Sequence, residues 1–420
     1  MNFQTIKFSP PVRVMMINPL IPASQLLITK ILSGVSFGRS QLVDLILLVY
    51  ANEIDAANDL GQELIACAFP CYNSVSVTSD LPSLADADVF CFMTNFENPN
   101  KFDFKEDDDL DKEKANEQFD NFYLIIKIAS NLAKPPTVKG PDEPAVGEDT
   151  GETIQPRKPI ILADGLLVLD ILMIVAKTLP QDMLFATTPL RSIAKITLSE
   201  FLKVKCCDLN QAYVWAANDT VFHAEIAVPF LKGDKISPDH WCEWNAMSPE
   251  MWESLGLEHI NFNASWMKRE FIEKMVAFSE ANPYGCIFKA AEMSRTMNAV
   301  WVPRSIDNHA RTSSTSIGVI SDGSLGTVKG LPYVLPLIIT ENDWSIDFKY
   351  EESSHLRHEI KRINTAAVEH HQKLVPYCKK FLQENVIDKA FIPVLVDSET
   401  ASVYSSVEEG SYNSGTSGSD

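Results

Sequence analysis

The sequence predicts an α/β protein in which a doubly wound parallel sheet is followed by a mixed α+β domain. Through residues 7–187, short apolar runs alternate with segments of helical periodicity, which is the pattern of a parallel sheet with helices on both faces. Through residues 188–390, strands follow one another around short turns and the helices are long, which is typical of a mixed domain. We therefore predict two domains with these bounds.

The individual elements follow from the spacing of apolar residues. In the segment 58–69, Leu60 and Leu64 recur at the spacing of one helix face. The segment 88–93 is instead, after Asp88, a continuous apolar run that is typical of a buried strand. Predicted strands are one that begins at Val12 and those at 45–49, 75–77, 88–93, 159–163, 184–187, 212–216, 221–228, 316–321, 333–339 and 344–350. Predicted helices cover 24–32, 58–69, 111–133, 166–178, 190–203, 265–281, 285–306 and 359–385.

Three segments interrupt this pattern. Residues 134–158 contain five prolines and three glycines with almost no apolar side chains to bury, which predicts a disordered insertion. Residues 232–262 are an irregular insertion that contains three tryptophans. Residues 391–420 are rich in serine, glycine and acidic residues, which predicts a disordered tail.

Charge and hydropathy exclude several classes of partner. The formal net charge of -20 argues against nucleic acid and against an anionic membrane, since both require a basic surface. The longest apolar run, 166–176, is interrupted by Asp170 and is too short to span a bilayer. The first residues, Met1–Lys7, lack the apolar core of a signal peptide. A cytoplasmic location is therefore expected.

The metal-binding side chains are not arranged as a metal site. The eight cysteines include no C-x-x-C pair, so we expect no zinc site but reduced, mostly buried thiols, with Cys67 in the core. Four histidines lie along the last predicted helix. We expect them to lie on the helix surface rather than to bind a metal. They are His355, His358, His370 and His371.

The first strand–turn–helix unit differs from a phosphate-binding turn. In such a turn, glycines allow the backbone to approach a pyrophosphate, which the helix N-terminus then binds. Here the turn runs from Asn18 to Pro22 without a glycine, and Ile21 precedes the helix. Two prolines remove backbone donors, and branched side chains fill the space that a pyrophosphate needs.

The end of the second strand also lacks a nucleotide-binding feature. An acidic residue at this point would bind the ribose hydroxyls. The strand instead ends at Val49, and the next acid along the chain is Glu53.

Five short strings occur in order along the chain. They are Pro11-Val12-Arg13-Val14, Phe37-Gly38, Cys67-Ala68-Phe69-Pro70, Ser265-Trp266-Met267-Lys268-Arg269-Glu270-Phe271 and Gly318-Val319-Ile320-Ser321-Asp322-Gly323. Together they resemble the cytosolic-type malate dehydrogenases of the lactate/malate dehydrogenase superfamily, and most of all their divergent 1B-like branch. The resemblance covers residues 7–385 apart from the two insertions. It implies a Rossmann-type first domain, NAD as coenzyme, and hydride transfer to or from C2 of malate or oxaloacetate.

The resemblance also indicates where the catalytic residues would stand. The general acid–base histidine matches Asn218, whose amide cannot shuttle a proton at neutral pH. The aspartate that orients the histidine matches Leu190, and a substrate-binding arginine matches Ile193. The alternatives are His223 as the acid–base and Arg191 as the anion-binding residue. The favoured interpretation gives neither a role in the site.

Two further matches concern substrate and coenzyme. An arginine on the loop after the strand 88–93 matches Asn98, and no arginine occurs between Arg39 and Arg157. The asparagine that contacts the nicotinamide matches Asp164, which places a negative charge where a neutral amide belongs. With Asn18, Ile21 and Val49, the coenzyme positions therefore all depart from the family pattern.

These departures predict a catalytically degenerate malate dehydrogenase-like protein that acts as a scaffold or interaction protein. No cofactor and no metal are expected. The resemblance implies a homodimer through the helix 58–69, and the scaffold hypothesis implies an unidentified protein partner. The alternative is an NAD-dependent malate dehydrogenase with substitute residues. A third hypothesis is a sensor that binds a ligand without turnover.

Overall fold

The structure is a computed structural model. It describes residues 10–96, 98–101, 122, 124–134, 158–202, 205–209, 211–226, 269–281, 285–304, 312–341, 343–347 and 354–384. The predicted insertion 232–262, the tail 391–420 and nearly all of the insertion 134–158 lie outside these residues.

The elements follow the predicted order. The strands are β1 (Val12–Ile17), β2 (Val43–Leu48), β3 (Tyr72–Thr78), β4 (Val89–Phe92), β5 (Ile160–Ala163), β6 (Leu184–Ala186), β7 (Ala212–Ala216), β8 (Phe222–Ile226), β9 (Ser313–Ile320), β10 (Pro332–Ile339) and β11 (Trp344–Ile346). The helices used below are α1 (Pro22–Leu32), α2 (Ile54–Ala66), α4 (Leu166–Val175), α5 (Leu190–Leu202), α7 (Phe271–Ala281), α8 (Cys286–Trp301) and α9 (Ser354–Glu384).

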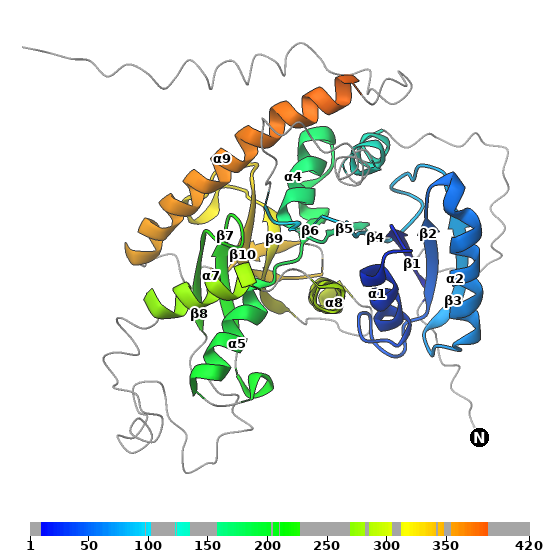
Figure 1. The fold of residues 1–420 in the computed structure, drawn as a ribbon, viewed down its shortest axis with the longest axis horizontal. Coiled ribbons are helices and arrows are strands. Elements are labelled where there is room, and N and C mark those ends of the chain that lie inside the picture. The colour runs from blue at the N-terminus through cyan, green and yellow to red at the C-terminus, as the bar shows by residue number, and fades with distance from the viewer. Residues whose placement is uncertain are drawn as a thin grey trace, which may run out of the picture.

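The sheet confirms the predicted fold class. In the described residues its order is β3-β2-β1-β4-β5-β6-β9-β10-β7-β8, with β11 beside β10. The strands β1 to β6 pair in parallel. The remaining strands pair antiparallel, and the pair Ala186–Gly318 joins the two parts. The result is a doubly wound parallel sheet that continues into a mixed region (Figure 1).

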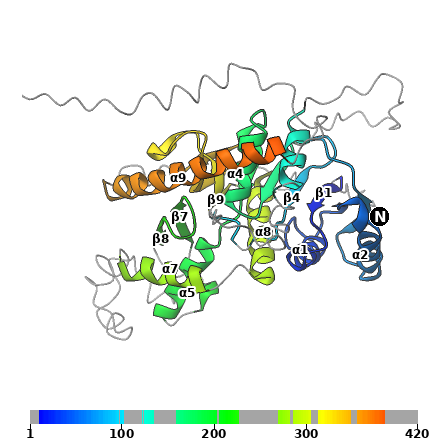
Figure 2. The ribbon, with the colours of Figure 1, turned by 45° about the horizontal axis from the view of Figure 1, so that its top comes forward.

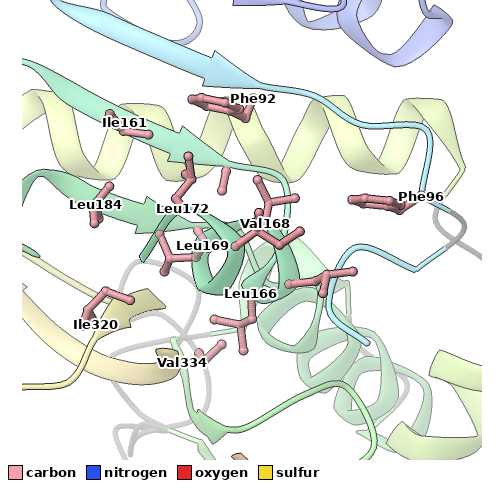
Figure 3. Packing of buried hydrophobic residues seen from close by; sticks show 14 of the residues in the cluster. Phe92, Phe96, Ile161, Leu166, Val168, Leu169, Leu172, Leu184, Ile320 and Val334 are labelled. Atoms are coloured by element: carbon pink, nitrogen blue, oxygen red, sulfur yellow. The ribbon is translucent and has the colours of Figure 1, made fainter. Parts of the chain in front are cut away.

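The helices cover this sheet in a way that defines two cores. Alternate residues of β1 enter opposite cores, with Met15 on one side and Val14 and Met16 on the other. Helix α4 is apolar on all sides except at Asp170 and lies in the first core, where Figure 3 shows Val168 and Leu172 beside Phe92 and Ile161. Helix α8 lies beside α1 at the junction of the two halves, as Figure 2 shows. Helix α9 runs from β7 and β8 to α4 (Figure 1).

Several element bounds and the burial of the cysteines differ from the prediction. Helix α2 covers Ile54–Ala66, whereas the sequence predicts 58–69. Helix α9 begins at Ser354, five residues before the predicted residue 359. Cys67 is exposed, which corrects its predicted place in the core: it caps the C-terminus of α2, and Cys71 is the buried thiol of that pair. Among the described cysteines, Cys207 and Cys286 are exposed as well, so the expectation of mostly buried thiols was wrong.

Two searches of the described residues gave negative results. No helix there is long and apolar enough to cross a membrane. No group of three or more His, Cys, Asp or Glu side chains in the same part of the chain is placed to hold a metal ion.

Candidate functional site

In a doubly wound sheet, a ligand binds in the crevice at the carboxyl ends of the strands where the strand order reverses. Here the reversal lies between β1 and β4. Asn18 follows β1 with a left-handed backbone (φ 55°), and its side-chain Nδ2 donates to the carbonyl of Met93 at 2.8 Å. One side chain therefore bridges the two strands at the point where a ligand would enter.

The N-terminus of α1 offers few donors to an anion. Ile21 is the N-cap, with no side-chain capping bond, and the first helical residue is Pro22, which has no N–H. Ile21 is half-buried and packs against the second core.

The residues at the end of β2, where the ribose of a dinucleotide would bind, make contacts within the chain. Val49 is buried, and its N–H donates to the carbonyl of Thr78 at 3.0 Å. The nearby acid Glu53 accepts from the N–H of Tyr50 at 3.2 Å and so completes a local capping box. Val49 has no carboxylate, and one oxygen of the Glu53 carboxylate is used by the backbone of Tyr50.

Asp164 is buried at the end of β5. Its Oδ2 accepts from the N–H and the hydroxyl of Thr94, each at 2.8 Å, whereas its Oδ1 is buried with no hydrogen-bond partner. Burial raises the pKa of Asp164, although the charge of Lys289 and the Thr94 hydrogen bonds oppose the shift. The carboxylate thus ties the ends of β5 and β4 together.

Lys289 crosses the same crevice from α8. Its Nζ donates to the carbonyl of Thr94 at 3.1 Å and to that of Phe96 at 2.9 Å. Sequence reasoning missed this residue, because a lysine in the first turns of a helix gives no sign of which distant carbonyls it reaches. With Asn18 and Asp164, Lys289 is the third side chain that bridges the crevice.

The loop after β4 is held against the start of α4. The carbonyl of Pro99 accepts from the N–H of Leu167 at 2.9 Å, and the side-chain oxygen of Asn100 accepts from the N–H of Leu166 at 3.0 Å. These bonds satisfy the otherwise unpaired donors of the helix N-terminus. Gly165 makes the approach possible, because a Cβ there would lie 2.2 Å from the Pro99 oxygen.

Gly165→Ala should therefore destabilise the protein. The clash is with backbone, which cannot rotate away, so we expect a loss of about 3 kcal/mol in the free energy of unfolding. Urea unfolding measures the loss, and Gly61→Ala, where a Cβ meets only the Val75 methyls at 3.6 Å and 3.9 Å, is the control. A Gly165→Ala variant as stable as this control would contradict the described contact.

The structure brings two of the predicted catalytic segments together. Asn98 Nδ2 donates to Asp219 Oδ2 at 2.7 Å, and Asn98 Oδ1 accepts from the N–H of Asn100. Asn218, the neighbour of Asp219, uses its side-chain oxygen in the turn before β8, accepting from the N–H and hydroxyl of Thr220 and the N–H of Val221. Both amides are thus used in contacts within the chain.

The other two catalytic positions are part of the core. Leu190 and Ile193 are 1% and 2% exposed and pack in the same cluster as α4. Arg191 points elsewhere: its guanidinium donates to the hydroxyl of Thr315 and lies near Glu292, and burial lowers its pKa. The structure therefore does not bring Arg191 to Asn98 and Asp219.

His223 lies on β8 with its own partners. Its Nε2 is 3.0 Å from Oε1 of Glu225, and its ring centroid is 5.5 Å from that of Trp215. Its described contacts are therefore with Glu225 and Trp215, on β8 and β7.

The buried charge of Asp164 predicts a dependence of stability on pH. Because the folded-state pKa is raised above its ordinary value of 3.8, the folded chain binds the proton more tightly than the unfolded chain. This contribution to stability is complete below pH 3.8 and is lost as the pH rises through the raised pKa. Asp164→Asn, which keeps an oxygen for Thr94, should remove this pH dependence. Urea unfolding from about pH 4 to pH 8 tests this, and equal slopes in both proteins would contradict it.

A parallel sheet of this strand order that continues into antiparallel strands is the fold of malate and lactate dehydrogenases, and solved structures show the likeness. Malate dehydrogenase from Naegleria fowleri superposes with a TM-score of 0.63 at 15% identity, covering 89% of this chain and 100% of that one. Lactate dehydrogenase from Trichomonas vaginalis in complex with NADH and oxamate gives 0.58 at 15% identity, covering 88% and 99%. Cryptosporidium parvum malate dehydrogenase gives 0.53 at 13% identity, covering 88% and 99%.

The sequence comparison gives the same class of protein. The chain is 24% identical to a malate dehydrogenase of Nicotiana tabacum over 355 residues, which are 80% of this chain and 89% of the relative. No protein-family model matches the chain. The chain is thus a malate/lactate dehydrogenase-like protein in fold.

Proposed function

We propose that this chain is a catalytically degenerate malate dehydrogenase-like protein that acts as a cytoplasmic scaffold or interaction protein. The observation that carries the proposal is the crevice bridged by Asn18, Asp164 and Lys289. These three side chains hold together the strand ends between which a coenzyme would have to lie.

The residues present do not fit NAD. A diphosphate needs backbone donors at the helix N-terminus, where this chain has Ile21 and Pro22. A ribose needs an acid at the end of β2, where the chain has buried Val49. Asp164 is a buried acidic residue where the resemblance places a neutral asparagine amide beside the nicotinamide.

The proton and anion chemistry is also missing at the matched positions. Hydride transfer to a ketone requires a group that donates a proton, and loss of such a group alone costs about 10²–10⁴ in rate. Asn218 has an amide that serves a turn, while Leu190 and Ile193 are core residues. The contact between Asn98 and Asp219 presents a carboxylate where a dicarboxylate substrate would need a cation.

Turnover is the direct test of the proposal. The full chain is mixed with oxaloacetate and NADH, and the loss of NADH absorbance is followed beside an authentic malate dehydrogenase. We expect no oxaloacetate-dependent rate above background. A rate that saturates with oxaloacetate would overturn the proposal in favour of an NAD-dependent malate dehydrogenase, the activity that the names of the similar proteins suggest.

A thermal-shift experiment distinguishes the third hypothesis, a sensor that binds a ligand without turnover, from the scaffold hypothesis. NAD, AMP and dicarboxylates are added in turn to the full chain, and a scaffold should show no increase in melting temperature with any of them.

We include in the proposal a homodimer that uses α2, where Ile65 is 45% exposed. Sedimentation at two protein concentrations measures its mass, and a monomer at both would remove the dimer.

A further inference from the structure

An open cavity of about 510 Å³ lies where β8, α7 and α9 meet. This volume is within the range of about 300–1,000 Å³ that small-molecule sites occupy. Its lining includes Thr220 and His223, beside the turn at Asn218, but none of the side chains that bridge the crevice.

One side of the cavity is apolar. Phe222 of β8 is 1% exposed, and Ile272 and Val276 lie one turn apart on α7, both half-buried. These side chains offer a hydrocarbon surface to a ligand with an aliphatic or aromatic body.

The charged groups of the cavity favour a cation. Glu273 and Glu280 come from α7, and Glu359 comes from α9. Glu273 also bonds to Arg269, in a pair whose two side chains are 80% and 65% exposed. Such an exposed pair contributes little and leaves the carboxylate available to a ligand.

The cation that lines the cavity is already satisfied. The Arg362 guanidinium donates to Glu359 Oε2 at 2.9 Å and 3.1 Å and to the carbonyl of Phe222 at 2.6 Å. The Nε2 atom of His223 lies 3.0 Å from Oε1 of Glu225. An anionic ligand would have to break these bonds, whereas a cation would meet the remaining carboxylate charge.

We propose that this cavity binds a small organic cation: a protonated amine carried on an apolar chain. The ammonium group lies at Glu280 and Glu273, and the hydrocarbon chain lies against Phe222 and Val276. The crevice chemistry plays no part in this binding, so the proposal stands or falls independently of the proposed function.

The test uses hexylammonium chloride, titrated into the full chain by calorimetry at constant ionic strength. We expect saturable binding, with n-hexanol and hexanoate binding at least several-fold more weakly. Glu280→Gln should weaken hexylammonium binding about 5-fold, the effect of one carboxylate in a partly solvated site. Glu369→Gln, which removes an exposed carboxylate of α9 that does not line the cavity, should bind as the unaltered chain does.

A second variant tests the apolar side. Val276→Phe fills the cavity and should abolish binding, with circular dichroism used to confirm that the variant is folded. If it does not fold, the Glu280→Gln result decides alone. Absence of saturable binding, equal binding of hexanol or hexanoate, or unchanged binding by Glu280→Gln would each overturn the proposal.

Discussion

Leu190→Asp should destabilise the chain by at least about 4 kcal/mol and should not create activity. The substitution introduces the acid that the resemblance places at this position in dehydrogenases. Leu190 is 1% exposed and packs in the core with α4. A carboxylate at this buried, apolar position would be removed from water, and the fold would bear the cost of that burial.

The measurement is urea unfolding followed by circular dichroism. Leu190→Met, which nearly conserves volume, is the control and should cost less than about 1.5 kcal/mol. A Leu190→Asp variant that is as stable as the Met variant would show that the position faces solvent or a cation. The position could then carry a catalytic acid, which would contradict the expected result.

His371→Leu should cost about 3 kcal/mol in the free energy of unfolding. His371 Nδ1 of α9 lies 2.7 Å from Asp170 Oδ1 of α4, and Asp170 is 1% exposed. The other carboxylate oxygen, Oδ2, is buried without a partner. Removing the imidazole would therefore leave a buried carboxylate with no compensating group, which is the costly way to break such a pair.

A double substitution distinguishes the pair from simple packing. Asp170→Leu combined with His371→Leu replaces both partners with apolar groups and should recover most of the lost stability. His358→Leu changes an exposed histidine of the same helix and should stay within about 0.5 kcal/mol. If His371→Leu costs no more than His358→Leu, the described pair does not hold α9 to α4.

The fold could be predicted because its signals are local. The run 89–93 is apolar throughout, and a strand of this kind must be buried on both faces of a sheet. The prediction failed where tertiary contacts decide. Cys67 has helical spacing with Leu60 and Leu64, but it lies at the end of α2, where the chain turns outward.

The site was predictable only in part, for the same reason. Asn98 and Asn218, which the resemblance matches to separate positions, lie on segments that the structure brings together, since Asn98 bonds to Asp219. Lys289 and its two carbonyl partners are more than 190 residues apart in sequence, and no local pattern links them. Asp170 and His371 are 201 positions apart in the sequence, and no local pattern links them.

We infer that the crevice of this dehydrogenase-like fold does not accept a dinucleotide. NADH is titrated into the full chain and the heat is followed by calorimetry up to about 1 mM coenzyme. We expect no saturable heat. Saturable binding of one NADH per chain that Lys289→Met alters would show that the crevice opens to receive the coenzyme, and would contradict this inference.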